Sequence, residues 1–322
     1  MTWRDPKYPL PDEDAFEAIK AGVDALPPGS KMLLNSGEFY SWDFTTANLQ
    51  LLARFFDKYP DYAERTFLSV KGGAPANSLG LDSSPENLRR SVDAINAALR
   101  GTKKLDLFEC ARVDPKYPVE EVIKILVGLK NEGKFSHIGM SECAAETLRR
   151  GHAVHPIAIV EIEVSLWSYE SETKKVIATA QELGIAVAAY SASTISLASR
   201  LPLADGSILI RSPTENDIRR HLTRFKEDYF KHNMAIVDAI KVLAAKKNIS
   251  PAQLAIAWVG SLGAHVIPLP GSSVKKRTLE NLSGGDVELS EADKAELAKI
   301  IADHEIKGDR YFGNDAAAHL WG

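Results

Sequence analysis

Thr66-Phe-Leu-Ser-Val-Lys71 is a short apolar run with the length and the β-branched content of a strand. Ser84-Pro85 then opens a helical pattern that continues to Leu99, with Ser84 as the expected cap and Pro85 as the first helical residue. A second apolar run follows at Leu105-Asp-Leu-Phe-Glu-Cys110. In both runs the apolar residues follow one another instead of alternating, which is typical of parallel strands that helices cover on both faces. This order of elements predicts a β-α-β unit of a parallel α/β fold.

The same alternation continues along the chain and predicts a single domain over residues 1–322. Seven strands are predicted, at residues 32–35, 66–71, 105–110, 135–141, 158–165, 186–191 and 265–270. Two of the helical patterns begin with the capping signals Ser250-Pro251 and Ser290-Glu-Ala-Asp293. Although one strand short, the pattern favours a (β/α)8 TIM-type barrel. A doubly wound sheet is the alternative, but no G-x-G-x-x-G turn follows the first predicted strand.

One region departs from this rhythm. Residues 201–246 combine a turn-rich stretch, a polar connection and a long helical pattern, all after the predicted strand that contains Tyr190. Active sites of barrels are built from the loops that follow the carboxyl ends of the strands, and long loops are often functional. We therefore expect this insertion to lie over a ligand.

The composition excludes several classes of function. The 322 residues are 45% hydrophobic and 25% charged, with a net charge of −4 and no basic excess, so nucleic acid is not expected as a partner. No apolar run has the length of a signal peptide or a membrane-spanning helix, so no membrane partner is expected either. Two cysteines and the absence of paired ligand spacing predict no disulfide framework and no metal site. We expect a protein of the cytosol or the nucleus.

Polar residues at the ends of the predicted strands are the candidates for chemistry, because barrel sites lie there. Lys71 stands out among them, since it closes an apolar strand where an ammonium loses part of its hydration. An ammonium in such a place favours ionisation of a nearby phenol, and a Tyr–Lys pair could then donate a proton in carbonyl reduction. Taken alone, Lys71 fits equally well as a strand-end charge that reaches water.

Five motifs occur in a fixed order along the chain: Asn35-Ser-Gly-Glu-Phe-Tyr40, Leu68-Ser-Val-Lys-Gly-Gly73, Asp106-Leu-Phe-Glu-Cys-Ala-Arg-Val-Asp114, Ile138-Gly-Met-Ser141 and Ile267-Pro-Leu-Pro-Gly-Ser-Ser273, the last continuing to Arg277, Glu280 and Asn281. In order and spacing they resemble the aldo-keto reductase superfamily, and most of all its fungal pyridoxal reductase branch. The resemblance covers essentially the whole chain and implies an eight-stranded (β/α) barrel. Because Met1-Thr-Trp3 resembles the end of the first strand of that barrel, we expect the N-terminal hairpin and the first strand to be missing, through a truncated gene model or a real loss.

The resemblance implies NADPH-dependent reduction of a carbonyl, with Tyr40 as the acid that donates the proton and Lys71 as the residue that tunes it. The family's catalytic aspartate falls on Asn35 and its catalytic histidine on Ala111, so two of the four customary residues differ. Without a carboxylate at position 35, Lys71 should find another carboxylate, such as Glu38, or else lower the pKa of the phenol.

The resemblance also implies which residues line the substrate, namely Trp3, Ala111 and Arg112. Ala111 leaves space and removes a donor to the carbonyl oxygen, a loss that typically costs about 3 kcal/mol in the transition state. The family carries a variable C-terminal tail, which begins here at about residue 305. This tail either folds over the substrate or packs against the outside of the barrel.

The segment after the last predicted strand suits a nucleotide. Backbone donors from Gly271 onward precede a helix and would favour a phosphate, and the planar fork of Arg277 matches the 2′-phosphate of NADP. By resemblance, Ser272 and Arg277 hold that phosphate, whereas Glu280 and Asn281 face the adenine.

The remaining cofactor contacts are implied by resemblance as well. Tyr190 corresponds to a ring that stacks on the nicotinamide, and Ser141 to a residue that contacts its carboxamide. Glu142 and Glu161 stand where the family usually has Asn and Gln. A carboxylate can accept the N–H of the amide but cannot donate to its carbonyl unless it is protonated.

Two functions follow, and they belong to different classes. The first is reduction of an aldehyde, with pyridoxal as the named candidate and pyridoxine as the product. The second is a catalytically silent barrel that binds NADP and regulates a partner, which Asn35 and Ala111 favour but which Tyr40 and Lys71 oppose. A non-productive fragment from a wrongly assigned start codon is a third interpretation.

Overall fold

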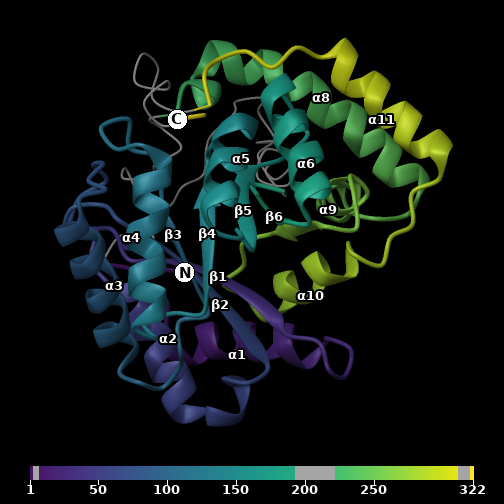
Figure 1. The fold of residues 1–322 in the computed structure, drawn as a ribbon. Coiled ribbons are helices and arrows are strands. Elements are labelled where there is room, and N and C mark those ends of the chain that lie inside the picture. Colours follow the sequence, from purple (N-terminus) through teal and green to yellow (C-terminus); the bar gives the residue numbers. More distant parts are fainter. Residues whose placement is uncertain (3–6, 193–221, 311–319) are drawn as a thin grey trace.

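The apolar runs of the sequence form seven strands of one parallel sheet, which curves into a nearly closed barrel surrounded by helices (Figure 1). The computed structural model describes residues 1–2, 7–192, 222–310 and 320–322. The strands follow one another in space in the order of the chain: β1 (Met32–Gly37), β2 (Thr66–Gly72), β3 (Leu107–Cys110), β4 (His137–Ser141), β5 (Ile159–Glu163), β6 (Ala186–Tyr190) and β7 (Val266–Leu269). Each coincides with one of the seven predicted runs, so the predicted TIM-type barrel is confirmed and the doubly wound sheet is excluded.

The helices form the outer layer of the molecule. They are α1 (Asp12–Asp24), α2 (Ala47–Lys58), α3 (Pro85–Leu99), α4 (Val119–Asn131), α5 (Ala145–Val154), α6 (Ser171–Leu183), α8 (Glu227–Lys246), α9 (Pro251–Gly260), α10 (Lys275–Ser283) and α11 (Glu291–Asp303), with the 3-10 turns η1 (Pro60–Tyr62) and η3 (Thr223–Phe225). Three predicted starts are confirmed by cap geometry: Ser84 accepts from the third residue of α3, and Ser250 and Ser290 form capping boxes. No helix among the described residues is long and apolar enough to cross a membrane.

Alternate side chains of the strands enter two separate cores. One set, which includes Leu68, Phe108 and Val160, points outward and packs against the helices. The other set points into the barrel and forms a smaller cluster: Leu33, Phe67, Leu107, Ile159, Ala188 and Leu269. Successive side chains of a strand point to opposite faces. A residue two positions beyond any member of the inner cluster therefore also points into the barrel, toward the carboxyl ends of the strands.

The barrel is open between its first and last strands. Within the described residues, β1 pairs only with β2, and β7 pairs only with β6. The helical layer is nevertheless continuous there, because α1 packs against α10. Gly22 of α1 permits this approach, since an added Cβ would lie 3.2 Å from Thr278 of α10. A gap between two strands is thus backed by two helices.

The expected insertion over residues 201–246 lies partly outside the described residues, which resume at residue 222. The described part contains α8, whose apolar residues Phe230, Val237, Ile240 and Leu243 are all buried. This helix packs against α9 and α11, and Figure 1 shows it beside α11 in the outer layer. The helical pattern of this region therefore builds the outer layer of the barrel. The whole insertion was expected to lie over a ligand; its described part packs in the outer layer instead, and its residues 201–221 are not described.

Replacement of Gly139 by alanine tests how tightly the inside of the barrel is packed. An added Cβ would lie 2.7 Å from Leu107 and 3.0 Å from the carboxyl group of Glu109, so Gly139→Ala should cost about 1–3 kcal/mol of the free energy of unfolding. Gly128 of α4 is the matched control, because a Cβ there meets no described atom within 4 Å. Gly128→Ala should stabilise by about 0.5–1 kcal/mol. Denaturant titration of both variants measures the difference, and equal effects would contradict the packing described.

Candidate active site

A cavity of about 620 Å³ opens at the carboxyl ends of the strands. It continues into the gap between β1 and β7, where Ile19 of α1 and Thr278 of α10 line its wall. Its size is typical of sites for small molecules and cofactors. Nine of the residues predicted from the sequence line this one cavity: Asn35, Tyr40, Lys71, Arg112, Glu161, Tyr190, Gly271, Ser272 and Asn281.

The strand alternation explains why polar groups meet at this end of the barrel. Nearer their carboxyl ends the strands carry a second, polar layer: Asn35, Lys71, Glu109, Glu161 and Tyr190. Lys71 lies four positions after Phe67 of the inner cluster, and each of the other four lies two positions after a member of that cluster. The strand register places two of these residues at the same height in the barrel, because Lys71 of β2 pairs with Glu109 of β3. The same sheet geometry that fills the lower barrel with apolar side chains therefore places ionisable groups at its mouth.

Lys71 lies at the centre of this layer and is only 3% exposed. Its Nζ forms an ion pair with Glu161 and lies 3.5 Å from Oε1 of Glu109. It also donates to Oδ1 of Asn35 at 3.4 Å, and Nδ2 of Asn35 in turn donates to Glu161. The ammonium lies 5.9 Å from the centre of the Tyr40 ring. The predicted Tyr–Lys pair is thus brought together in one cavity.

The charges around Lys71 shift the titration of the whole cluster. Burial alone would lower the pKa of the Lys71 ammonium, but attraction by Glu161 and Glu109 outweighs it and raises the pKa above its ordinary value. Burial raises the pKa of Glu109 well above its ordinary value, with Lys71 opposing and Glu161 adding to the shift. Burial also raises the pKa of Tyr40, and Lys71 only partly offsets it. Of the two alternatives expected for Lys71, the first holds, because the ammonium finds another carboxylate in Glu161. Tyr40 is therefore a protonated acid at neutral pH.

The loop after β1 holds Tyr40 in place. The backbone N–H of Glu38 donates to the carbonyl of Lys71 at 2.8 Å, and Gly37 lets the Tyr40 ring pack on the backbone, because an added Cβ would lie 2.6 Å from that ring. Glu38 was expected as a partner of Lys71, and this was wrong. Its carboxylate accepts hydrogen bonds from Arg90 at 2.6 Å and Ser91 at 2.5 Å. It therefore ties the Tyr40 loop to α3.

The predicted nucleotide segment lies at the far end of the same cavity. An added Cβ at Gly271 would meet no described atom within 4 Å, so the backbone there is open to a ligand. Ser272 caps the turn before α10, since its Oγ accepts from the N–H of Val274 at 3.2 Å. Asn281 is buried and donates to the carbonyl of Gly271 at 3.5 Å. Arg277 and Glu280 lie between them along α10, outside the cavity lining.

Ser141 and Glu161 have different surroundings at the strand ends. Ser141 is buried, its Oγ has no hydrogen-bond partner among the described residues, and it lines a second, smaller pocket that shares Arg112 with the cavity. Glu161 lines the cavity, but its carboxylate is engaged by Lys71 and Asn35. Glu142 is fully buried and accepts from the N–H of Glu163 at 2.8 Å. The contacts of Ser141 and Glu161 with a carboxamide stay predictions.

The C-terminal segment reaches the site through Arg310. This buried guanidinium donates to Glu142 at 3.0 and 3.1 Å, to Glu163 at 2.7 Å and to the Tyr190 hydroxyl at 3.3 Å. It also lies 5.4 Å from the centre of the Trp321 ring, and the backbone N–H of Trp321 donates to the carbonyl of Glu142. Arg310 and Trp321 thus lie at the strand ends beside Tyr190, whereas the start of the tail, at residues 305–308, contacts α8 and η3.

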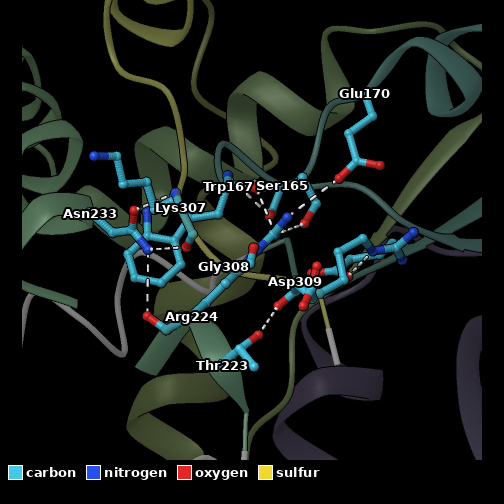
Figure 2. A network of polar contacts seen from close by, with 12 residues as sticks. Ser165, Trp167, Glu170, Thr223, Arg224, Asn233, Lys307, Gly308 and Asp309 are labelled. Atoms are coloured by element: carbon cyan, nitrogen blue, oxygen red, sulfur yellow. Dashed lines mark hydrogen bonds and ion pairs between the residues drawn. The ribbon is translucent and has the colours of Figure 1, made fainter. Parts of the chain in front are cut away.

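Figure 2 shows how the chain just before Arg310 is held. Arg224 of η3 donates from Nε to the carbonyl of Gly308 at 3.0 Å and from Nη1 to the carbonyl of Trp167 at 2.8 Å. Thr223 donates to the carbonyl of Asp309 at 2.8 Å, and Asn233 of α8 exchanges two hydrogen bonds with the backbone of Lys307. These contacts fix the backbone that delivers Arg310 to the mouth of the barrel.

The predicted substrate residues are placed only in part. Arg112 lines the cavity, and its Nη1 donates to the carbonyl of Ala111 at 2.6 Å. Ala111 follows β3 directly and is half-buried. Trp3 lies outside the described residues. No group of three or more potential metal ligands occurs in the part of the chain that the structure describes.

Two charged residues of this region, Arg310 and Arg224, were not predicted as site residues, and Glu109 was a strand-end candidate whose contact with Lys71 was not predicted. The strand register was the available signal for Glu109, because it stands directly opposite Lys71 on the next strand. The arginines had no such signal, since they lie in irregular segments far along the chain from Glu142 and Trp167.

The fold and this site define a class of protein. A family model described as the aldo/keto reductase family matches residues 1–302. The chain therefore belongs to the aldo-keto reductase family, whose members are oxidoreductases that use NADP(H) and act on small carbonyl compounds. The family, the enzyme class and the cofactor predicted from the sequence are confirmed by this membership.

Two named proteins of fungi are similar to this chain in sequence. "Probable pyridoxal reductase 2" of Schizosaccharomyces pombe is 36% identical over 321 residues, which are 97% of this chain and 92% of the relative. "Aldo-keto reductase str7" of Strobilurus tenacellus is 34% identical over 251 residues, which are 76% of this chain and 71% of the relative.

Two solved structures share the fold. The glycerol dehydrogenase of Gluconobacter oxydans superposes with a TM-score of 0.74 at 22% identity, over 95% of this chain and 90% of that one. An aldo/keto reductase of Klebsiella pneumoniae, solved with NADP and acetate, superposes with a TM-score of 0.65 at 18% identity, over 96% and 92% of the two chains. At these identities the likeness concerns the fold alone.

Removal of the Arg310 guanidinium tests its place in the buried network. Arg310→Gln leaves the fully buried Glu142 without its cation, so the free energy of unfolding should fall by about 3–5 kcal/mol. Arg149 is the matched control, because its ion pair with Glu182 is exposed, and Arg149→Gln should cost less than about 1 kcal/mol. Denaturant titration compares the two variants, and similar losses would contradict a special role of Arg310.

Proposed function

We propose that this chain reduces an aldehyde to an alcohol with NADPH, and that pyridoxal is the aldehyde and pyridoxine the product. One observation carries the proposal: the phenol of Tyr40 and the buried ammonium of Lys71 face the same cavity, with 5.9 Å between the ammonium and the centre of the ring. Burial keeps Tyr40 protonated, which is the form that can donate a proton to a carbonyl oxygen. Tyr40 is the proton donor in this proposal, and Lys71 orients and tunes it.

The residues of the cavity fit a dinucleotide. The backbone at Gly271 is open to a ligand in the cavity, and the Ser141 hydroxyl, buried without a partner among the described residues, lines a smaller pocket that shares Arg112 with the cavity. In the proposed binding mode, Ser141 contacts the carboxamide and Tyr190 stacks on the nicotinamide, whereas Gly271 lies against a phosphate. When bound, NADPH supplies the hydride that adds to the carbonyl carbon.

In the proposed binding mode, the 2′-phosphate and the adenine of NADPH lie at the start of α10. Ser272 and Arg277 bind the 2′-phosphate in this proposal, while Glu280 and Asn281 contact the adenine. An N-terminal helix turn favours a phosphate through its free N–H groups, and Arg277 adds a positive charge with a geometry that fits phosphate oxygens.

The choice of pyridoxal is supported by the relative named "Probable pyridoxal reductase 2", which is 36% identical over 97% of this chain. Ala111 and Arg112 lie at the end of β3, where they would border the substrate. The small side chain of Ala111 leaves room for a substituted ring. The guanidinium of Arg112 provides a donor in the same cavity.

An assay of the purified protein tests this function directly. NADPH absorbance should fall in the presence of pyridoxal, and more slowly with simple aldehydes and ketones. Tyr40→Phe should lower the rate by at least about 10²-fold, because a positioned acid contributes that much, while NADPH binding changes little. Tyr229→Phe, which alters an exposed tyrosine of α8, is the control. If the protein binds NADPH but reduces no carbonyl compound, the silent regulatory barrel replaces the proposal.

Arg277→Ala tests recognition of the 2′-phosphate. Loss of a charge-assisted hydrogen bond should weaken NADPH binding by about 10–100-fold, with a much smaller effect on NADH. The adjacent Lys276 is exposed, and Lys276→Ala is the matched control for removal of a charge from the same turn. Fluorescence titration of both cofactors gives the dissociation constants. Parallel losses for NADPH and NADH would contradict the assignment.

A further inference from the structure

Three strands besides its own supply the surroundings of the Lys71 ammonium. Asn35 comes from β1, Glu109 from β3 and Glu161 from β5, and Lys71 itself stands on β2. Asn35 offers an amide oxygen at 3.4 Å and Glu109 a carboxyl oxygen at 3.5 Å, whereas Glu161 forms the tightest contact, a direct ion pair. The ammonium therefore extends across the barrel to reach a charge on β5.

Only one of these groups is suited to carry the neutralising charge. An ammonium that is 3% exposed requires a carboxylate, because an uncompensated buried charge is costly. Asn35 has no charge. Glu109 is fully buried, its two oxygens accept no hydrogen bond from the described residues, and burial raises its pKa well above the ordinary value. Two carboxylates this close together do not ionise equally, and the charge is favoured on Glu161, whose oxygens accept the hydrogen bond from Asn35 and form the direct ion pair with Lys71.

Asn35 orients this arrangement without supplying charge. Its Nδ2 donates to the Glu161 carboxylate, which leaves Oδ1 directed at Lys71. One amide thus binds both members of the ion pair and fixes their relative position. A carboxylate at position 35 would instead lie beside Glu161 and repel it. The neutral residue on β1 and the charged residue on β5 therefore complement each other.

We infer that Glu161 is a positioning residue of the proposed reaction: it is the counter-ion of Lys71, oriented by Asn35, and it fixes the ammonium beside Tyr40. This inference deepens the proposed function and rests on it for its catalytic consequence. The ion pair itself is a property of the protein without cofactor. The ion pair and its effect on the reaction can therefore be measured separately.

Glu161→Gln is the first variant of the test, and Glu109→Gln is its matched control. Both replace a buried carboxyl group within reach of Lys71 by an amide of the same shape. Glu161→Gln should lower kcat for pyridoxal by about 10²-fold, since displacement of a catalytic group by about 1 Å has that effect. Glu109→Gln should lower kcat far less, because Lys71 keeps its direct ion pair with Glu161 in that variant.

The transposed variant Asn35→Asp/Glu161→Gln moves the charge from β5 to β1. Because Oδ1 of residue 35 already lies 3.4 Å from the ammonium, this variant should recover most of the lost rate. Recovery separates a loss of charge from general damage to the barrel. A double variant no faster than Glu161→Gln, or a Glu109→Gln variant as slow as Glu161→Gln, would overturn the inference.

The pH profile provides a readout that a merely structural role would not move. The titratable groups that face Tyr40 are Lys71, Glu109 and Glu161, and Arg112 lines the same cavity. The charge on Glu161 raises the pKa of the phenol, so its removal lowers that pKa. The basic limb of kcat/KM should therefore move to lower pH in Glu161→Gln and return in the transposed variant. An unchanged limb would contradict the inference.

Thermal unfolding of the cofactor-free protein distinguishes this inference from the proposed function. Glu161→Gln should lower the Tm by about 5–10 °C, Glu109→Gln by much less, and the transposed variant should recover most of the loss. If this pattern holds but the wild-type protein reduces no aldehyde, the proposed function fails and the counter-ion assignment stands. If the wild-type protein is active and the pattern fails, the counter-ion assignment is wrong and the function stands.

Discussion

A lysine ammonium inside a barrel is stable only when carboxylates surround it, and the mouth of this barrel is built around that requirement. Lys71 is held by groups from β1, β3 and β5, so three neighbours of different strands must keep their register for the ammonium to stay in place. The loop that carries Tyr40 depends on the same strand, because Glu38 donates its backbone N–H to the carbonyl of Lys71. The register of the strands, the burial of the ammonium and the acid strength of Tyr40 are therefore all linked through Lys71.

The sequence was sufficient for those features that short-range patterns encode. Consecutive apolar residues, such as those in 66–71 and 105–110, identified buried parallel strands, and Ser-Pro or capping-box signals identified helix starts. The position of Lys71 and Tyr40 at strand ends was also predictable, because strand ends meet at one edge in a parallel fold. These features depend on residues within a few positions of one another.

The partners of the charged groups could not be derived in the same way. Glu161 lies 90 positions after Lys71 and reaches it only because the barrel brings β5 opposite β2, which no local pattern states. Glu38 was mistaken for a partner of Lys71, since its nearness in sequence hid the turn that directs it to Arg90. Arg310 lies in a segment without periodicity, and its contact with Glu142 joins residues 168 positions apart in the chain.

The gap between β1 and β7 gives the cavity a wall that is partly main chain. Each of these strands pairs on one side only within the described residues, and every second residue of a strand directs its N–H and C=O toward the other side. On β7 the residues that face the gap include Pro268, which lacks the N–H, and Val266, whose N–H is bonded to the carbonyl of Gly263, so this strand offers carbonyl groups there. Side-chain substitution leaves such groups intact, so alanine scanning would attribute too little of any ligand's affinity to this wall. Amide-to-ester replacement in the backbone would be the way to measure it.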